Sequence, residues 1–537
     1  MKINYTQLYI KVHYFFFFAS TGVTYPYVPV YGKQLGISPL VLGIICTIFP
    51  ILYLIAKPVF GFLVDYFGNW RKLIFIMLII ITSSSLLVIF FLPSLPGPKF
   101  LDQHLQNISC ASLSHCDMEY HASVIALCNG TIDTTCHWIC ENTNFSVRLS
   151  FHINQNKAII SSDSTCLLNI NQTLLCQRSV TNNYNCNITC GNFENQCVYI
   201  SITFWIFILL WCLGEISYYT SLGINDAICF DILGQAKQLK IGKQRLWATM
   251  GYGVAACLSG YMVDLWSHEE IYKTYTLMLI PAAIFICIDL ICCIKLKMSF
   301  KSGSTTILKD VIMLLKSKSI IIFLCFATFL GILDSIKRNF LLWYVEDLAV
   351  TTNYMSKIKL IEGLITLAET FGGEIVFLFF SGKIMNKLGY TYTLIFCFIC
   401  YSFRLGLISL SPMPWWILPI ELLLHGPSYA LCIATIITYA NSVTPPGASA
   451  TIQGLVQSVH DGFGYLIGSL VVGVSYAKFG GTITMRIFSV FAAFFAIAYF
   501  LFHILYLKHK TSDSRNNIEW KKPDDAQKHC VVAEIDA

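Results

Sequence analysis

The sequence has few charged residues for its length. Asp, Glu, Lys and Arg make up 12% of the 537 residues, which is about half the share in an ordinary soluble domain. So few charges cannot cover the surface of a water-soluble globule of this size, so a soluble multidomain enzyme is excluded. Hydrophobic residues make up 55% of the chain, which excludes an intrinsically disordered protein. The net charge of +6 is small and argues against binding to nucleic acid.

The sequence signatures of enzymes are also missing. No Gly-rich phosphate loop follows a strand pattern, no nucleophile motif is present, and the cytosolic segments lack His and Cys at the spacing of metal ligands. The first apolar stretch begins at residue 8 and has no small-residue cleavage site, which indicates a retained helix instead of a signal peptide. We therefore expect no enzymatic activity, no cofactor and no bound metal.

Long apolar stretches are what the sequence has instead. A helix needs roughly 20 apolar residues to cross the hydrocarbon core of a bilayer, and an open sheet would leave its backbone groups without hydrogen bonds there. Twelve stretches are long enough, which predicts an all-α polytopic membrane protein. The predicted spans are 8–31, 39–64, 73–92, 200–224, 246–266, 274–294, 319–345, 355–380, 391–411, 415–440, 451–476 and 483–507.

Lys and Arg residues gather on one side of these spans. They include Arg71, Lys72, the lysines of residues 295–318 and the basic residues of the tail from Lys508. Segments rich in Lys and Arg stay in the cytoplasm, so we expect both termini to be cytoplasmic. The predicted organisation is helices 1–3 (1–92), an extracellular loop (93–199), helices 4–6 (200–294), a basic cytoplasmic linker (295–318), helices 7–12 (319–507) and a cytoplasmic tail (508–537).

The long hydrophilic segment 94–200 has the composition of a loop in an oxidising compartment. Its even number of cysteines predicts up to five disulfides, and its sequons predict N-glycosylation. We expect the plasma membrane as its location, with the topologically equivalent endolysosomal membrane as the alternative. The disulfide candidates are Cys110, Cys116, Cys128, Cys136, Cys140, Cys166, Cys176, Cys186, Cys190 and Cys197, and the glycan acceptors are Asn107, Asn129, Asn144, Asn171 and Asn187.

A short motif recurs at the cytoplasmic ends of two spans. The spacing Gly-x3-Asp/Asn-x2-Gly ends the second span at residues 61–68 and the eighth span at residues 382–389. The recurrence predicts two related six-helix halves joined by residues 295–318. Repeated halves around a site at the membrane midplane are typical of secondary transporters.

The first copy of the motif, together with two basic residues, resembles a known family. Gly61, Asp65, Gly68, Arg71 and Lys72 resemble the loop between helices 2 and 3 of the major facilitator superfamily. The resemblance implies the twelve-helix major facilitator fold, with these residues at a cytoplasmic gate. Asp226 and Arg245 flank the loop between the fourth and fifth spans and can pair at the same gate.

Further stretches resemble one animal branch of that superfamily, the major facilitator domain-containing protein 6-like group. This branch is grouped with symporters similar to lactose permease and with nucleoside–proton symporters. The stretches are residues 25–29, 244–247, 371–374, 445–448 and 453–454.

Ionisable residues inside the spans are the candidates for the transport site. A charge at the bilayer centre costs about 2.5–3.5 kcal/mol on insertion scales, so such residues usually face a cavity and pair. Glu215 lies in the fourth span, and His425 follows Glu421 by one helical turn on the same face. The second half has six charged residues near mid-depth, which are Asp334, Lys337, Arg338, Glu369, Arg404 and Glu421.

Symporters similar to lactose permease use a Glu in helix 8, an Arg in helix 9, and a His and a Glu in helix 10. The resemblance implies the same use for Glu369, Arg404, Glu421 and His425, although the order of Glu and His is reversed here. A carboxyl group in a low-dielectric medium holds its proton more tightly. Glu369 or Glu421 would then bind a coupled proton, modulated by Arg404. A purely structural ion-pair network and direct solute binding stay open as alternatives.

Together these patterns predict a secondary active transporter that moves a small polar solute by alternating access, with a proton as the coupled ion. The alternative is a cell-surface receptor that engages an extracellular protein ligand through residues 94–200. The expected partners are therefore a small solute, a proton and the lipid bilayer, with a protein ligand of the loop as a further candidate.

Overall fold

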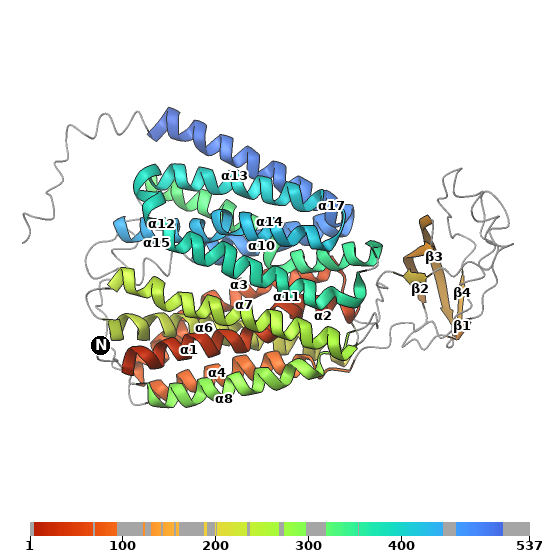
Figure 1. The fold of residues 1–537 in the computed structure, drawn as a ribbon, viewed down its shortest axis with the longest axis horizontal. Coiled ribbons are helices and arrows are strands. Elements are labelled where there is room, and N and C mark those ends of the chain that lie inside the picture. Colours follow the sequence, from red (N-terminus) through yellow and green to blue (C-terminus); the bar gives the residue numbers. More distant parts are fainter. Residues whose placement is uncertain are drawn as a thin grey trace, which may run out of the picture.

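The structure is a computed structural model in which the long helices form one bundle (Figure 1). It describes residues 5–67, 70–93, 122–123, 130–140, 143–154, 157–160, 187–190, 199, 201–233, 237–267, 273–296, 318–352, 354–443 and 458–507. Residues 297–317 of the predicted linker 295–318 and the tail from residue 508 lie outside these ranges.

The first half of the bundle is built from long apolar helices separated by short breaks. Pro39 sits at the start of α3, and the Ser38 hydroxyl accepts the Val41 N–H, which fixes where that helix begins. The elements are α1 (Tyr5–Thr24), η1 (Tyr25–Tyr27), α2 (Val28–Gln34), α3 (Pro39–Tyr66), α4 (Arg71–Ile89), α6 (Ile202–Leu233), α7 (Lys237–Ser267), η5 (Thr276–Met278) and α8 (Leu279–Lys295).

The second half packs beside the first, and its last long helix is divided by a kink at Gly480, where φ is +76°. A positive φ is a conformation that glycine adopts without steric cost. The elements are α10 (Lys318–Thr352), η6 (Met355–Lys357), α11 (Ile358–Ala368), η7 (Glu369–Glu374), α12 (Ile375–Leu388), α13 (Tyr390–Ser409), η8 (Pro414–Trp416), α14 (Ile417–His425), η9 (Gly426–Ala430), α15 (Leu431–Val443), η10 (Ser458–Gly464), α17 (Tyr465–Phe502) and η11 (His503–Leu507).

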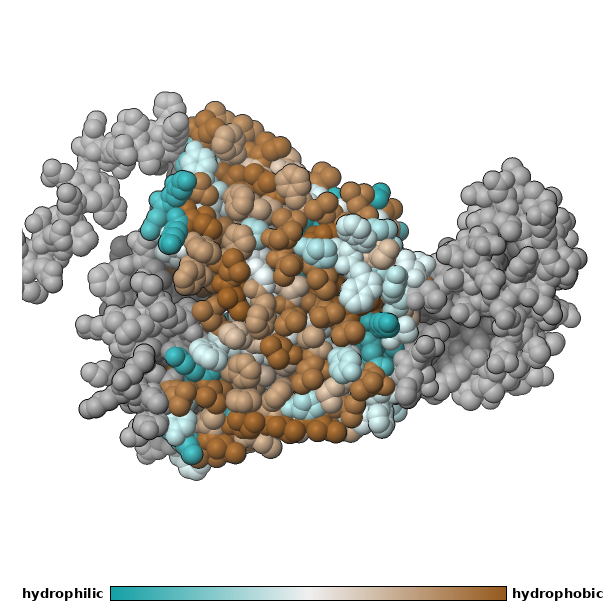
Figure 2. Space-filling model, viewed as in Figure 1, coloured by the Kyte–Doolittle hydropathy of each residue, from teal (hydrophilic) through white to brown (hydrophobic). Residues whose placement is uncertain are grey.

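Helices occupy at least part of each of the twelve predicted spans. Within the described residues, nine helical segments are long and apolar enough to cross a membrane, and one of them, Val459–Leu505, contains the kink at Gly480. Helices α1 and α7 are not among the nine. The bundle surface is predominantly hydrophobic between its two ends (Figure 2). The fold is therefore that of a polytopic helical membrane protein, while the count of twelve crossings stays a prediction.

Strands occur only beyond one end of the helical bundle among the described residues (Figure 1). We call this the loop end, because residues 94–200 leave the bundle there. An antiparallel sheet has the strand order β1-β4-β3-β2-β5. The strands are β1 (Ala122–Ser123), β2 (Gly130–Cys140), β3 (Thr143–Asn154), β4 (Lys157–Ile160) and β5 (Asn187–Cys190). The sequence patterns had predicted a loop here without strands.

The sheet aligns two of the disulfide candidates. Cys136 of β2 is the direct register partner of Cys190 of β5. Cys140 ends β2, and the glycan acceptors Asn144 and Asn187 lie in β3 and β5. The other candidates lie outside the described residues, which are Cys110, Cys116, Cys128, Cys166, Cys176, Cys186, Cys197, Asn107, Asn129 and Asn171.

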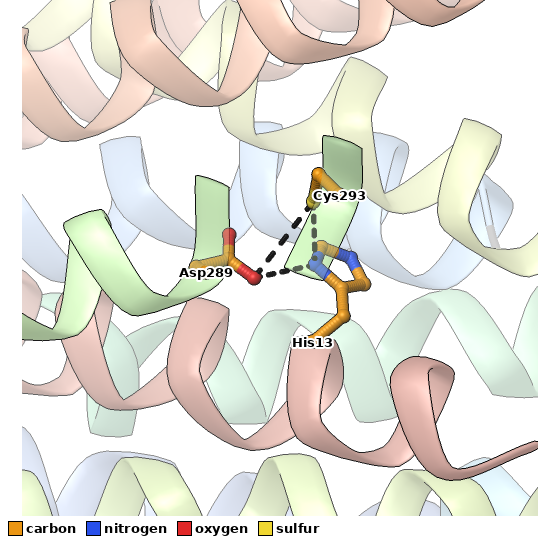
Figure 3. Close-up of side chains that lie close together, drawn as sticks. All are labelled: His13, Asp289 and Cys293. Carbon is orange, nitrogen blue, oxygen red and sulfur yellow. Dashed lines mark hydrogen bonds and ion pairs between the residues drawn. The ribbon is translucent and has the colours of Figure 1, made fainter. Parts of the chain in front are cut away.

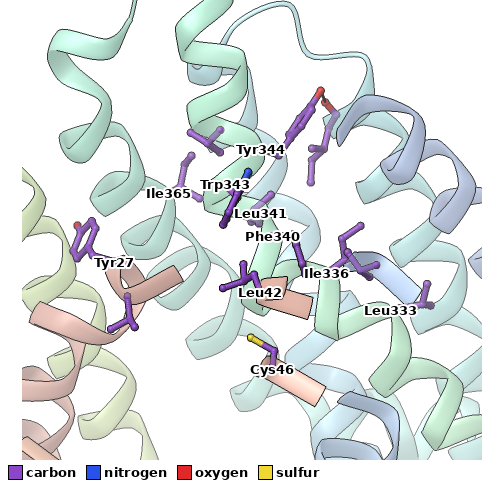
Figure 4. Close-up of a cluster of buried hydrophobic side chains, with 14 of the residues drawn as sticks. Tyr27, Leu42, Cys46, Leu333, Ile336, Phe340, Leu341, Trp343, Tyr344 and Ile365 are labelled. Carbon is purple, nitrogen blue, oxygen red and sulfur yellow. Dashed lines mark hydrogen bonds between the residues drawn. The ribbon is translucent and has the colours of Figure 1, made fainter. Parts of the chain in front are cut away.

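One apolar core connects the two halves. Leu42 and Cys46 of α3 belong to the same buried cluster as Phe340 of α10 and Ile365 of α11 (Figure 4). Close backbone contacts strengthen the connection: a Cβ on Gly260 of α7 would lie 2.1 Å from the Lys359 carbonyl oxygen of α11. Only glycine allows this approach. The halves therefore meet along tightly packed helices between which polar side chains are enclosed.

Candidate functional site

Arg404 is the centre of the buried polar cluster in the second half. It lies on α13 and is 1% exposed. Its Nε donates to Glu421 Oε1 at 2.9 Å, and its Nη2 donates to Glu421 Oε2 at 2.6 Å, so the guanidinium binds both carboxylate oxygens. Nη1 also donates to the Ser428 hydroxyl at 3.2 Å. Paired, charge-assisted hydrogen bonds of this kind are the strong ones, and they hold α13 against α14.

Glu369 is bound more loosely at the edge of the same cluster. Its Oε1 is 4.0 Å from Arg404 Nη2. Its Oε2 lies 3.1 Å from the ammonium of Lys337, a side chain on α10 that is 23% exposed. The Lys337 ammonium also lies over the ring of Tyr429, 5.5 Å from its centre. Glu369 therefore depends on a partner that can move, whereas Glu421 is fixed by two bonds.

His425 completes the cluster on the far side of Glu421. Its Nδ1 is 3.8 Å from Glu421 Oε2 and makes no hydrogen bond within the described part of the chain. Its Nε2 is 3.3 Å from Glu374 Oε1. The structure thus brings together Glu369, Arg404, Glu421 and His425, the four residues that the sequence predicted as a group.

Three helices of this region contain short π-helical segments. One covers Glu369–Glu374, one begins directly after His425, and one covers Ser458–Gly464. Two of them touch backbone to backbone, because a Cβ on Gly426 would lie 2.3 Å from the Gly373 carbonyl oxygen. Pro427 removes one helical N–H donor. Such bulges occur frequently at functional sites, and here they aim Glu369 and Glu374 toward α14.

Asp334 lies in the same half but has separate partners. The Tyr401 hydroxyl donates to its Oδ1 at 3.0 Å, and the Tyr465 hydroxyl donates to its Oδ2. These bonds join α10 to α13 and α17. Asp334 is therefore satisfied by two hydroxyl groups and stands beside the Arg404 cluster without an ion pair of its own to it in the described residues.

Glu215 pairs across the two halves. It lies on α6 in the first half and is 2% exposed. Its Oε2 is 3.1 Å from Nη2 of Arg338 on α10 of the second half, and the Tyr25 hydroxyl donates to its Oε1 at 2.6 Å. The Arg338 guanidinium also contacts the hydroxyl groups of Tyr25 and Tyr219. Glu215 is thus brought to the interface of the halves, away from Arg404.

The ion pair of Glu215 and Arg338 lines a pocket between the halves. Aromatic rings and small polar groups form the other walls, and Asn339 donates to the Ser469 hydroxyl at 2.9 Å. The free volume is about 20 Å³, room for about one water molecule, so the pocket is nearly closed in this structure, although its walls combine flat apolar faces with a few fixed hydrogen-bonding groups. The lining residues are Tyr25, Pro29, Cys46, Phe49, Pro50, Tyr53, Trp211, Glu215, Arg338, Asn339, Tyr465 and Ser469.

A second set of ion pairs joins the halves at the loop end. Lys33 of α2 reaches across to α10, where its Nζ is 2.6 Å from Asp347 Oδ1 and 3.4 Å from Glu346 Oε2. The buried Lys359 of α11 continues the chain of charges, 2.5 Å from Glu346 Oε1 and 3.1 Å from Glu362 Oε2.

The segment after α7 adds two more contacts across the halves. Lys273 pairs with Asp264 at 3.1 Å and donates to the Ser356 carbonyl oxygen at 3.0 Å. Asp264 in turn accepts the Leu360 N–H at 2.7 Å, at the start of α11. We call Lys33, Asp264, Lys273, Glu346, Asp347, Lys359 and Glu362 the loop-end network.

The sequence patterns did not single out the lysines of the loop-end network. Lys33, Lys273 and Lys359 lie at the edges of predicted spans, where lysine is ordinarily solvated. In the structure they are 6%, 2% and 1% exposed. The signal that could have found them is the matching acidic pair at the end of a neighbouring span, Glu346 and Asp347.

Most of the predicted cytoplasmic gate lies outside the side chains that the structure describes. This holds for Gly61, Asp65, Gly68, Asp226 and Arg245. Two further members are described. Nε of Arg71 donates to the Val64 carbonyl oxygen at 2.9 Å, and Lys72 donates to the Ile294 carbonyl oxygen. These bonds tie the start of α4 to the ends of α3 and α8 within the first half. A gating role for the motif stays a prediction.

Comparison with known proteins gives one family and a set of similar structures. The profile of the MFS_1 like family matches residues 7–488. The nucleoside transporter NupG matches with a TM-score of 0.58 and 14% identity, covering 93% of this chain and 99% of that one. A bacterial homologue of the human lysosomal transporter Spinster, in an inward-facing and unoccupied conformation, matches with a TM-score of 0.54 and 12% identity, covering 94% and 97%. At these identities the structural likeness shows the fold alone.

Proposed function

Because the chain belongs to the MFS_1 like family and is a multi-pass membrane transporter, we propose that it moves a small polar solute together with a proton by alternating access. The observation that supports the proton is the unequal pairing of two buried carboxylates around Arg404. Glu421 has two short bonds to the guanidinium, and Glu369 has one bond to Lys337 and a long contact to Arg404.

Glu369 is the better proton carrier on this geometry. Protonating Glu421 would weaken both bonds of the guanidinium fork and leave a buried arginine without its partner, which is costly in a low-dielectric medium. Protonating Glu369 releases only the Lys337 ammonium, which is partly exposed and can find another partner. Arg404 then stays paired with Glu421, and its positive charge beside Glu369 favours proton release from that carboxyl group.

Adjacent residues on α10 provide the coupling between proton and solute. Lys337 binds Glu369 in the second half, and the next residue, Arg338, binds Glu215 in the first half. When Glu369 takes up a proton, Lys337 loses its ion pair. This removes one of the contacts that fix this turn of α10, and the turn carries Arg338, whose ion pair with Glu215 lines the pocket. Solute binding at the Glu215 and Arg338 pair acts on the same turn from the other side.

The pocket supports a solute that has both a flat apolar face and hydrogen-bonding groups. Tyr25, Tyr53 and Trp211 offer aromatic faces, and Glu215 with Arg338 offers an acceptor and a donor. A nucleoside has both properties and is the first solute to test, in keeping with the nucleoside transporter among the similar structures. Under the predicted topology the loop end, where ion pairs join the two halves, is extracellular. Because the halves are closed there, the pocket would exchange its solute with the cytoplasm.

The proposal is tested by uptake into proteoliposomes with and without an imposed pH gradient, using a panel of nucleosides and other small polar solutes. We expect wild-type accumulation to require the gradient. Glu369→Gln should lose that accumulation and retain exchange of internal for external solute, because exchange needs no net proton release. The matched control is Glu362→Gln, a buried carboxylate of the loop-end network, whose uptake should still respond to the gradient.

Two results would reject proton coupling through this cluster. One is wild-type uptake that ignores the pH gradient for every solute transported. The other is uptake that stays coupled in both Glu369→Gln and Glu421→Gln. The cluster would then be a packing network or a direct solute site.

We also propose that residues 94–200 face the extracellular side of the plasma membrane, with both termini cytoplasmic, and that the six-segment division of the chain holds. The pairing of Cys136 with Cys190 in the sheet register supports a disulfide-bonded loop.

A folded sheet at this position also supports the second candidate function, recognition of a protein ligand. Deleting residues 105–197 separates the two: intact transport after deletion assigns the loop to recognition, protection or trafficking.

A further inference from the structure

Three side chains that commonly bind metals meet inside the first half, apart from the residues proposed for transport. His13 comes from α1, and Asp289 and Cys293 come from successive turns of α8 (Figure 3). His13 Nδ1 is 2.6 Å from Asp289 Oδ1 and 3.1 Å from Cys293 Sγ, and Sγ is 3.9 Å from Oδ1. None of the three is more than 1% exposed. An imidazole, a carboxylate and a thiol therefore point at one another in a closed space.

The surroundings orient His13 as a metal ligand. Its second nitrogen, Nε2, is 2.7 Å from the side-chain oxygen of Asn225 on α6. A histidine that binds a metal through one nitrogen usually donates the N–H of the other to a carbonyl or carboxylate oxygen, which fixes the tautomer. With Nε2–H donated to Asn225, the lone pair of Nδ1 faces Asp289 and Cys293. Phe17 and Phe75 close the site, with ring centres 5.7 and 5.6 Å from the imidazole.

One oxygen in this cluster lacks a partner. Asp289 Oδ2 is buried and makes no hydrogen bond to any described residue. An unpaired buried carboxylate oxygen is costly, and a cation bound through both carboxylate oxygens would give Oδ2 a partner. This orphaned oxygen is a second observation, independent of the meeting of the three side chains.

We propose that His13, Asp289 and Cys293 bind one transition-metal ion of the zinc class. Zn²⁺ accepts this mixture of nitrogen, oxygen and sulfur, at about 2.0–2.3 Å. Tetrahedral ligands at those bond lengths lie about 3.3–3.6 Å apart, so the three donor atoms have to shift by less than about 1 Å. The carboxylate and the thiolate balance the two charges of the ion, and the Cys293 thiol proton and the proton shared by His13 and Asp289 are released.

The site would join the first and last helices of the first half, since α1 supplies one ligand and α8 supplies two. It does not depend on the proton or the solute proposed above. The sequence analysis expected no bound metal. It could not reveal these three ligands, because α1 and α8 are far apart along the chain and the ligands have no local spacing.

The test is a titration of the purified full-length protein with Co²⁺ after removal of bound metal by a chelator. A cysteine ligand gives Co²⁺ an intense thiolate charge-transfer absorption. We expect saturable absorption at one ion per chain in the wild type, abolished by added Zn²⁺. Cys293→Ser should lose it. The neighbouring Cys292→Ser is the matched control and should keep it.

The proposal is overturned if the wild type shows no saturable absorption or if the absorption survives in Cys293→Ser. In either case the cluster is a hydrogen-bonded His–Asp pair beside a thiol. The wild-type titration decides the first outcome without any variant, so a misfolded variant cannot hide it. A second readout is thermal stability in detergent, which should rise with Zn²⁺ in the wild type and in Cys292→Ser but stay unchanged in Cys293→Ser.

Discussion

At the scale of single residues, Arg404 decides the chemistry of the second half. A buried guanidinium between two carboxylates can hold one of them ionised and leave the other free to exchange a proton. Glu421 lies 2.6 Å and Glu369 4.0 Å from the guanidinium, and our proposal therefore gives the proton to Glu369. The same arrangement makes the cluster sensitive to the loss of one member, because a buried charge without its partner destabilises a fold strongly.

This dependence gives a stability prediction. Arg404→Met should destabilise the protein by about 3–5 kcal/mol, because Glu421 is left buried and unpaired. The double variant Arg404→Met with Glu421→Met should recover most of that loss, since it removes both charges together. The measurement is thermal unfolding in detergent for the two single variants and the double variant. A double variant that is no more stable than Arg404→Met alone would show that the pair is not the source of the loss.

The sequence showed which ionisable residues lie inside the membrane-spanning helices, but it did not show all of their partners. Glu369, Arg404, Glu421 and His425 could be grouped because they resemble the set of residues in symporters similar to lactose permease. Glu215 could be named but not paired, because Arg338 comes from the other half. The rotation of a helix about its axis and its packing against a distant helix are tertiary properties. They decide the pairing, and a linear pattern of charges does not record them.

At the scale of helices, the contact of α7 with α11 is one of the places where the halves are packed most closely. Gly260 lies where α7 presses against the Lys359 carbonyl group, next to the loop-end network. The ion pairs of Lys33 and Lys273 close the same end. Opening the pocket toward the loop end therefore requires α7 and α11 to separate and several ion pairs to break.

A side chain at position 260 should force that separation. Gly260→Leu cannot fit against the Lys359 carbonyl, so we expect the loop end to be wedged open and transport to be lost. The measurement is the rate at which a membrane-impermeant maleimide, added from the loop side, labels a cysteine placed in the pocket by Asn339→Cys. Labelling of the same protein without Asn339→Cys is subtracted. The labelling rate should rise several-fold.

Gly223→Leu is the matched control, because a Cβ there meets nothing within 4 Å. Its labelling rate should equal that of the protein that carries Asn339→Cys alone. Normal transport and an unchanged labelling rate in Gly260→Leu would contradict the role of this contact.

The sheet at the loop end makes a covalent prediction. Because Cys136 and Cys190 are register partners on antiparallel strands, their Cα atoms lie within the range that a disulfide spans. Peptide mapping by mass spectrometry without reduction should recover a fragment in which these two cysteines are joined. Recovery of Cys136 linked to a different cysteine would contradict the observed register.

At the scale of the whole molecule, composition and long apolar stretches were sufficient to predict a polytopic helical membrane protein, and the resemblance of residues 61–72 indicated the family. Each predicted span contains helix, and the family match covers most of the chain. The local strands β2, β3 and β4 were not singled out in the cysteine-rich loop, and β5 joins β2 from nearly fifty residues away in sequence, so no local pattern shows its partner. The loop-end network was missed for the same reason, since its charges pair only after the halves pack.

The central claim is that solute movement is coupled to a proton through Glu369. The most direct measurement follows solute and internal pH together in proteoliposomes that start without a pH gradient. We predict that adding the transported solute to the wild type acidifies the lumen as solute enters, and that Glu369→Gln exchanges solute with no change in internal pH. Solute entry into wild-type vesicles at constant internal pH, measured without other ion gradients, would contradict the claim.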